Sequence, residues 1–400
     1  MLLSHPEKLL KDHLRNVFLI GDAIFKQKSI QFKSFSKDKL RCLNKLNLLG
    51  HDLGKATSFF QDYIKSSDKD AYRNDEKKRH GLLSGVLSFK IVNMLIGDEC
   101  LAYLSYMVVS KHHGELDDIS SFTSVLSGND KNMGLLREQY ESIDRGALQQ
   151  ILDDLKINFD ILNYTTDEFL KDIDYLVSRS VRKKVKSMTG LEFFLLINFL
   201  FSVLIFSDKL EAIYNSENMD IEGFIKKNTK RPTLLPSCVE GYKKTLGKGN
   251  AKMGGYRDAA YGEVLYSIEN LDLEKKILSL NLPTGAGKTL TVFGAALRLK
   301  ERLNKERGYD PRIIYVLPFT SIIEQNFDVF EKILDTKDTN ILLKHHYLSE
   351  RVYRWESDGK MENYSEGISE HLVESWDSEI VVSTFVQLLH SIFTNRNKRL

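Results

Sequence analysis

The stretch His51-Asp52-Leu53-Gly54-Lys55 decides how the first half of the chain is interpreted. It joins two adjacent side chains that bind metal ions, a glycine that stops a helix, and a lysine. Such a run predicts the centre of a metal site that acts on phosphodiesters. A histidine-aspartate pair alone recurs by chance, so the prediction depends on what the rest of the chain places around it.

The segment around this stretch has the pattern of a helical domain. Apolar residues recur at three- and four-residue intervals, and no proline occurs between Pro6 and Pro232. This pattern predicts an all-α domain over residues 1–225. Phe193 to Phe206 is strongly apolar, but it is shorter than the ~20 residues that a membrane-spanning helix needs. We interpret it as a buried core helix and expect no membrane contact.

Five histidines and two aspartates lie where the predicted helices present apolar faces. His13 is in line with Val17, for example, and Asp208 continues the face of Leu204. For any one histidine, a core side chain satisfied by a hydrogen bond is the simpler interpretation. Buried carboxylates, however, need a partner or a cation, and the whole set favours a metal centre. The candidate ligands are His13, His51, Asp52, His80, His112, His113 and Asp208.

The ordered set resembles the HD-domain metallonucleases, and more narrowly the nuclease domain of the CRISPR-associated helicase-nucleases of type I systems. The resemblance implies that Asp52 bridges two divalent transition-metal ions, each completed by three further ligands. His13, His51 and Asp208 would complete one site, and His80, His112 and His113 the other. Imidazole and carboxylate ligands suit Mn, Fe, Co or Ni better than magnesium.

The same resemblance makes Asp52 and Lys55 the candidate catalytic residues. Lys55 would steady a phosphate oxygen, and a solvated surface lysine is the alternative. The basic run Arg182-Lys183-Lys184-Val185-Lys186 would contact a DNA backbone, with a solvated helix face as the alternative.

The second half of the chain contains a phosphate-loop motif between an apolar run, Ile277 to Leu282, and a helical stretch to about Asn304. Ile313 to Leu317 and Ile380 to Val382 are further apolar runs, each leading into a helix. Strand, turn and helix in repetition predict a parallel α/β sheet. The motif would hold Mg-ATP through backbone N–H groups, a lysine and a threonine hydroxyl. Its residues are Pro283, Thr284, Gly285, Ala286, Gly287, Lys288 and Thr289.

This half resembles the first RecA-like lobe of superfamily 2 helicases. The resemblance implies that Thr320, Ser321, Gln325 and Thr384 face single-stranded DNA. A Walker B pair would follow its strand, whereas Asp377 and Glu379 precede one. We therefore expect an incomplete lobe over residues 263–400, truncated within the first helicase lobe, and a connecting segment over 226–262, where glycine and proline break the periodicity. The adjacent histidines His345 and His346 lack a surrounding ligand set and are not expected to bind metal.

Composition sets limits on function but does not reveal it. Lys plus Arg number 57 against 55 Asp plus Glu, so bulk charge indicates neither nucleic acid nor a membrane. The three cysteines form no zinc or disulfide pattern, which favours a reducing cytoplasm. The N-terminus lacks a secretory signal pattern.

Taken with the resemblance, these observations predict a metal-dependent single-stranded DNA endo- or exonuclease of type I CRISPR interference, normally coupled to ATP-driven 3'-5' unwinding. The expected partners are single-stranded DNA and a crRNA-guided surveillance complex, and the chain is expected to be a monomer. One alternative is an HD-type phosphohydrolase of nucleotides or cyclic nucleotides. Another is a non-catalytic fragment that binds nucleotide and docks on a partner.

Overall fold

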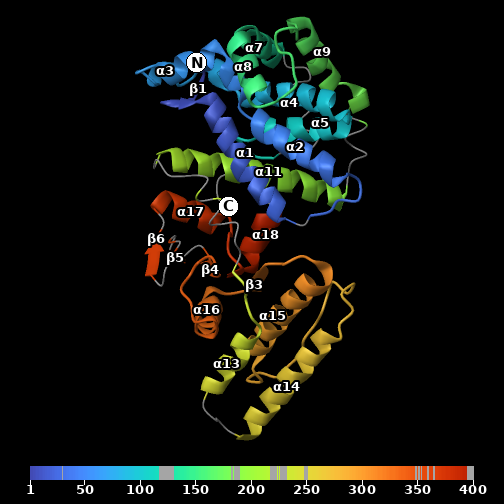
Figure 1. The fold of residues 1–400 in the computed structure, drawn as a ribbon, viewed down its shortest axis with the longest axis vertical. Coiled ribbons are helices and arrows are strands. Elements are labelled where there is room, and N and C mark those ends of the chain that lie inside the picture. The colour runs from blue at the N-terminus through green and yellow to red at the C-terminus, as the bar shows by residue number, and fades with distance from the viewer. Residues whose placement is uncertain are drawn as a thin grey trace. The chain divides into compact units, whose positions relative to one another are not determined.

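The computed structural model divides the chain into two compact units, one within Met1–Thr229 and one over Lys230–Thr394. It describes residues 1–28, 30–116, 130–181, 183, 190–216, 223, 225, 232–246, 251–346, 349, 352, 354–357, 360–363 and 365–393. The chain is mostly helical and contains a small parallel sheet (Figure 1).

In the residues that the structure describes, the first unit consists of helices and one short hairpin. The two strands of the hairpin, β1 (Leu3–His5) and β2 (Lys8–Leu9), are antiparallel, and an all-α prediction does not include them. Each is too short to show an alternating pattern. The helices are α1 (Leu10–Gln27), α2 (Lys37–Gly50), α3 (Ser58–Lys65), α4 (Gly81–Ile96), α5 (Glu99–Ser110), α7 (Asp130–Glu141), α8 (Arg145–Asp154), α9 (Thr166–Leu176) and α11 (Leu191–Ser216), with 3-10 turns η1 (Leu53–Ala56), η2 (Asp70–Tyr72) and η3 (Glu76–Lys78).

One continuous apolar core joins the helices of this unit. Helix α1 packs on α2 and α11, and α4 packs on α2 and α5 (Figure 1). The first turns of several helices are capped by side chains, as in α3, where Thr57 accepts a hydrogen bond from the N–H of Phe60. The packing brings the N-terminal ends of α1 and α4, the C-terminal ends of α2 and α5, and the C-terminal half of α11 to one place.

Helix α11 is the apolar segment that sequence assigns to the core. By length and composition alone, Leu191–Tyr214 could cross a membrane, with mean hydropathy 1.9, but a single such helix is weak support because core helices pass the same test. It packs against α1 and carries the half-buried Asp208 and the buried Glu211 on its inward side. Polar groups inside the core of a helical unit favour the core-helix interpretation.

The second unit has a three-stranded parallel sheet in the order β3-β7-β4. Register pairs Leu317 of β3 with Thr384 of β7, so the carboxyl ends of these strands lie at the same edge. Strands β3 and β7 agree with the sequence prediction, while β4 was not predicted. The strands are β3 (Ile313–Leu317), β4 (Leu342–His345) and β7 (Ile380–Thr384), beside a hairpin of β5 (Arg354–Ser357) and β6 (Lys360–Asn363), and the helices are α13 (Ser237–Thr245), α14 (Ala251–Glu269), α15 (Lys288–Arg307), α16 (Thr320–Leu334), α17 (Glu366–Glu374) and α18 (Phe385–Phe393).

Two sequence expectations are wrong in this unit. Much of the segment 226–262, predicted to be a connection, forms α13 and part of α14. Its glycines weaken a helix by about 1 kcal/mol each, but α14 packs closely on α15, where Tyr261 lies over Gly294. Ile277 to Leu282 is not a strand, and Ile277 is 91% exposed, because no described strand pairs with this run.

Candidate metal centre and phosphate loop

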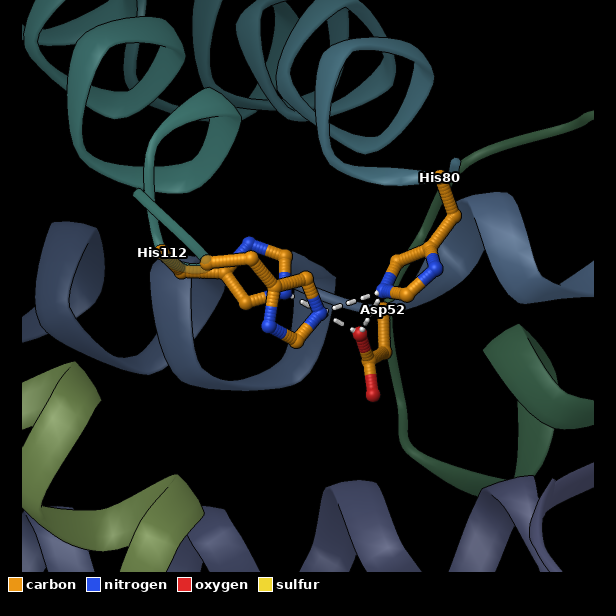
Figure 2. Close-up of side chains that lie close together, drawn as sticks. Asp52, His80 and His112 are labelled. Carbon is orange, nitrogen blue, oxygen red and sulfur yellow. Dashed lines mark hydrogen bonds and ion pairs between the residues drawn. The ribbon is translucent and has the colours of Figure 1, made fainter. Parts of the chain in front are cut away.

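Asp52 lies at the centre of the buried cluster, between the end of α2 and the turn η1. Its two carboxylate oxygens face different sets of side chains. Oδ1 is 2.9 Å from His80 Nε2 and 3.3 Å from His112 Nε2. Oδ2 is 3.1 Å from His13 Nε2 and 3.4 Å from His51 Nε2. Figure 2 shows the rings of His80 and His112 pointing at this carboxylate. One side chain thus contacts both halves of the cluster.

All seven predicted ligands are brought together from five segments of the first unit. Three groups of described side chains have possible ligand atoms within 4.8 Å of one another; one consists of His5, His13 and Glu211, and the other two contain Asp52. Of the two groups with Asp52, the first adds His80, His112 and His113, and the second adds His13, His51 and Asp208. These are the two sets that the sequence resemblance implied. Among the described residues, no such group contains His345 or His346.

Local structure explains why the chain can pack so closely here. A Cβ atom on Gly54 would lie 2.6 Å from the backbone oxygen of His80, so only glycine permits this approach of η1 to the start of α4. The Gly54 N–H also donates to Ser84 Oγ at 2.9 Å. The glycine of the opening stretch therefore brings Asp52 and His80 into contact.

Backbone hydrogen bonds orient two of the imidazole rings. His51 Nδ1 is 2.9 Å from the Leu48 oxygen, and His112 Nδ1 is 2.6 Å from the Val109 oxygen. Carbonyls only accept, so each Nδ1 carries the proton and donates it. The lone pair is then on Nε2, which is the atom that faces Asp52.

Electrostatics keeps the carboxylates ionised and His80 and His113 neutral; burial, together with His112 and His80, lowers the pKa of His113 to about 2. Burial alone would raise the pKa of Asp52, but Lys55, His51 and His80 outweigh it and hold that pKa well below its usual range. The pKa of Asp208 is lowered in the same way by His13 and His51. Burial lowers the pKa of His80 to about 4, although Asp52 opposes the shift. Anionic oxygens and neutral nitrogens are the forms that bind a cation.

The donor set fits divalent transition metals. It offers five imidazoles and two carboxylates beside the apolar core of the first unit. The buried carboxylates of Asp52 and Glu211 and the half-buried carboxylate of Asp208 lie close together, with Lys55 and Lys8 as their lysine partners. Bound cations would balance the remaining negative charge. No cysteine belongs to the groups formed by described residues, so a thiolate site of the zinc-finger kind is not supported.

Lys55 lies beside Asp52 and is buried. It is 4% exposed, and its Nζ lies 2.6 Å from Asp52 Oδ2 and 3.3 Å from the Ser4 oxygen. The alternative of a solvated surface lysine is therefore wrong. In the described structure, the ammonium group is the nearest cation to the carboxylate that is predicted to bind metal.

Two residues of the cluster were missed by sequence reasoning. Glu211 is fully buried and lies 2.6 Å from His13 Nδ1, and His5 packs edge-on against His13. Glu211 follows Asp208 by three positions on the same helix, and this spacing was an available signal. His5 precedes the hairpin turn and belongs to no helical face, so the periodicity does not indicate its place.

The phosphate-loop motif precedes α15 directly, and Lys288 is the first helical residue. Gly285 and Gly287 have φ of 81° and 83°, a backbone conformation that glycine adopts readily. The hydroxyl of Thr289 is 3.0 Å from Asn326 Oδ1, and Arg257 Nε donates to the Gly285 oxygen at 2.8 Å. Asn326 and Arg257 were not predicted. Lys288 is exposed at the N-terminus of a helix, a place where phosphate groups bind.

The four residues predicted to face DNA come to one edge of the sheet. Thr320, Ser321 and Gln325 are in the first turns of α16, which follows β3, and Thr384 ends the neighbouring β7. Ser321 and Gln325 are exposed and the threonines are partly so. The basic run 182–186 lies outside the described residues except for Lys183.

The acidic residues before β7 are engaged in ion pairs. Arg312 binds Asp377 at 2.6 Å, and Lys300 binds the buried Glu379 at 3.0 Å. Both carboxylates therefore hold the sheet to its neighbouring segments. The observation agrees with the interpretation that they are not a Walker B pair.

Two comparisons with known proteins indicate the class of protein to which the chain is similar. Residues 251–399 match the family model of the type III restriction enzyme res subunit, ResIII, which is of the helicase type. A curated relative, the CRISPR-associated nuclease/helicase Cas3 of Haloferax volcanii, is 26% identical over 373 residues. That match covers 87% of this chain and 39% of the relative, so the chain spans about two fifths of the length of the curated relative it matches. The chain is therefore similar to Cas3, and its second half matches a family of the helicase type.

A solved structure of T. fusca Cas3-ATP also matches. It shares 12% identity at a TM-score of 0.44 and covers 96% of this chain and 42% of that chain. At this score the likeness is too weak to support a conclusion about the site.

Proposed function

We propose that the first unit is an HD-type metallonuclease domain that cleaves single-stranded DNA. The observation that best supports this proposal is that the two oxygens of Asp52 face two separate sets of possible ligands, most of them buried. Asp52 would bridge two ions; His13, His51 and Asp208 would hold one, and His80, His112 and His113 the other. When bound, Mn, Fe, Co or Ni ions would generate hydroxide and neutralise charge on a phosphodiester.

The residues of the chain have distinct tasks in this proposal. The backbone acceptors of His51 and His112 keep Nε2 available as a donor atom, and burial keeps His80 neutral. Lys55 holds a positive charge beside Asp52 that attracts a phosphate oxygen when the ammonium group leaves that carboxylate. Cleavage of this kind requires no contact with base edges, so it acts without sequence preference.

In the second unit, residues 283–289 would bind the phosphates of Mg-ATP, and Thr320, Ser321, Gln325 and Thr384 would contact the DNA backbone. The exposed Lys288 and the two positive-φ glycines support this assignment. By its relation to Cas3, the chain would act in the cytoplasm, in CRISPR antiviral defence, on DNA supplied by a crRNA-guided surveillance complex.

The test is cleavage of single-stranded DNA by the purified chain with Mn²⁺, Co²⁺ or Ni²⁺, with EDTA as the metal-free control. Asp52→Ala should abolish cleavage, and Asp154→Ala, which removes only an exposed ion pair with Lys11, should leave it intact. The same preparations are offered nucleotides and cyclic dinucleotides. Cleavage of these small substrates without cleavage of DNA would replace the nuclease by a phosphohydrolase.

A further inference from the structure

Glu211 is a fully buried carboxylate that does not face Asp52. It lies on α11 three residues beyond Asp208, and its exposed fraction is 0%. An isolated carboxylate in such a place costs several kcal/mol unless its oxygens are hydrogen-bonded or paired. The contacts of this side chain therefore need an explanation that core packing alone does not give.

Both oxygens of Glu211 are engaged by donors. Oε2 lies 2.6 Å from His13 Nδ1. Oε1 lies 3.1 Å from Lys8 Nζ and 3.2 Å from Asn16 Nδ2. Lys8 and Asn16 hold one oxygen in place, so that the other points at the imidazole ring. Lys8 comes from β2 and Asn16 from α1, which makes the hairpin and the first helix a frame for this carboxylate.

The contact decides which nitrogen of His13 is available for a metal ion. A carboxylate accepts but does not donate, so the proton is on Nδ1 and a lone pair can be on Nε2. Nε2 is the atom that faces the cluster, 3.1 Å from Asp52 Oδ2 and 3.3 Å from Asp208 Oδ1. His51 and His112 obtain the same orientation from neutral backbone oxygens. A charged carboxylate that accepts the Nδ1 proton makes Nε2 a stronger metal ligand than a neutral backbone carbonyl does.

We infer that Glu211 is a positioning residue of the metal centre, which orients His13 and strengthens its Nε2 as a ligand. The inference rests on the proposed metal centre and adds a residue to it. Glu211 also forms a possible ligand group with His5 and His13. Its Oε1 is already engaged by Lys8 and Asn16 and its Oε2 by His13, so its contacts fit the orienting role better than that of a ligand.

Metal affinity provides the first test, with Co²⁺ titrated into the full chain. Glu211→Gln should weaken Co²⁺ binding by about 10–100-fold, the usual effect of losing such an outer partner, and should change the visible absorption of the bound ion. The matched control is Glu192→Gln in the first turn of the same helix, whose carboxylate binds only Ser34 at the surface. Its Co²⁺ affinity should equal that of the wild type. Co²⁺ affinity within twofold of the wild type in Glu211→Gln would overturn the inference.

A second measurement does not depend on the variant folding. With Zn²⁺ as a diamagnetic probe, the ¹⁵N shifts of wild-type His13 should show a protonated Nδ1 and a metal-bound Nε2. Metal on Nδ1 would contradict the role given to Glu211. If the wild type takes up neither Co²⁺ nor Zn²⁺, the proposed metal centre itself fails, and this outcome is distinct from a normal affinity in Glu211→Gln.

Discussion

The metal cluster and the phosphate loop are built in opposite ways. Most of the cluster is buried beside one core, and five segments of the same unit bring its seven ligands into two groups whose ligand atoms lie within 4.8 Å of one another. The phosphate loop is exposed, and the run that precedes it, Ile277 to Leu282, forms no strand. A site enclosed by its own core is organised by packing. A loop at a helix end obtains its geometry from a few local bonds and from φ values that glycine allows.

One substitution in each region should separate the two activities, nucleotide binding and DNA cleavage, most clearly. Lys288→Ala should abolish nucleotide binding and leave metal-dependent DNA cleavage unchanged, whereas Asp52→Ala should do the reverse. Lys305→Ala, at the far end of α15, is the control for loss of a lysine on that helix. Binding of a fluorescent ADP and cleavage of labelled DNA are measured on the same preparations. Loss of both activities in either variant would show that the regions do not work separately.

Truncating a leucine should lower the free energy of unfolding by several kcal/mol more in the first unit's core than in the run before the phosphate loop. Leu104→Ala empties a fully buried site in α5 and should destabilise the first unit by about 2–5 kcal/mol. Leu278→Ala truncates a half-exposed side chain before the phosphate loop and should cost less than about 1 kcal/mol. Denaturant unfolding followed by circular dichroism gives both values. Equal destabilisation would mean that the run before the loop is packed after all.

Metal affinity should depend on pH through His13. Burial disfavours its charged form, but hydrogen bonds to Asp208, Asp52 and Glu211 outweigh burial and raise the pKa to about 10. His13 is therefore protonated at pH 6–8 without metal and must release one proton to bind an ion. Mn²⁺ affinity should rise about tenfold per pH unit over this range. His80 adds no slope, because its pKa of about 4 leaves it neutral. A flat profile in calorimetry would contradict the protonated state of His13.

The smallest expected effect is that of substituting Asn326 on the binding of Mg-ADP at the phosphate loop. Its side chain accepts from the Thr289 hydroxyl, which is the group expected to face magnesium. Asn326→Ala should weaken Mg-ADP binding by about 3–10-fold, the worth of one hydrogen bond, and leave metal-free ADP binding unchanged. Asn270→Ala removes a similar bond to a helix carbonyl on α14 and serves as the matched control. An equal loss with and without Mg²⁺ would assign Asn326 to the loop's fold instead.

Sequence predicted the cluster better than the sheet, for physical reasons. Histidines and aspartates on apolar faces violate the usual pattern of a helix, so residues such as His13 and Asp208 are conspicuous without any knowledge of tertiary contacts. Strand β7 was predicted because a short β-branched run is bounded by turns, as at Ile380 to Val382. A run such as Ile277 to Leu282 has the same local composition, but a strand also needs neighbours, which a local pattern does not contain.

The remaining misses also depend on tertiary contacts. Glu211 looks like an ordinary acidic residue near the end of a helix until the packing of α11 on α1 buries it. Lys55 is indistinguishable from a surface lysine until η1 places it under the hairpin, at the Ser4 oxygen. The glycines of α14 suggested a connection, and the packing of Tyr261 against α15 overrides that local preference.

The central claim is that Asp52 joins two metal sites, and metal content tests it most directly. Elemental analysis of the chain after incubation with Mn²⁺ and desalting should give about two ions per chain. Asp52→Ala should lose both, because each oxygen of Asp52 belongs to a different group of ligands. Two ions retained in Asp52→Ala, or none in the wild type, would contradict the account.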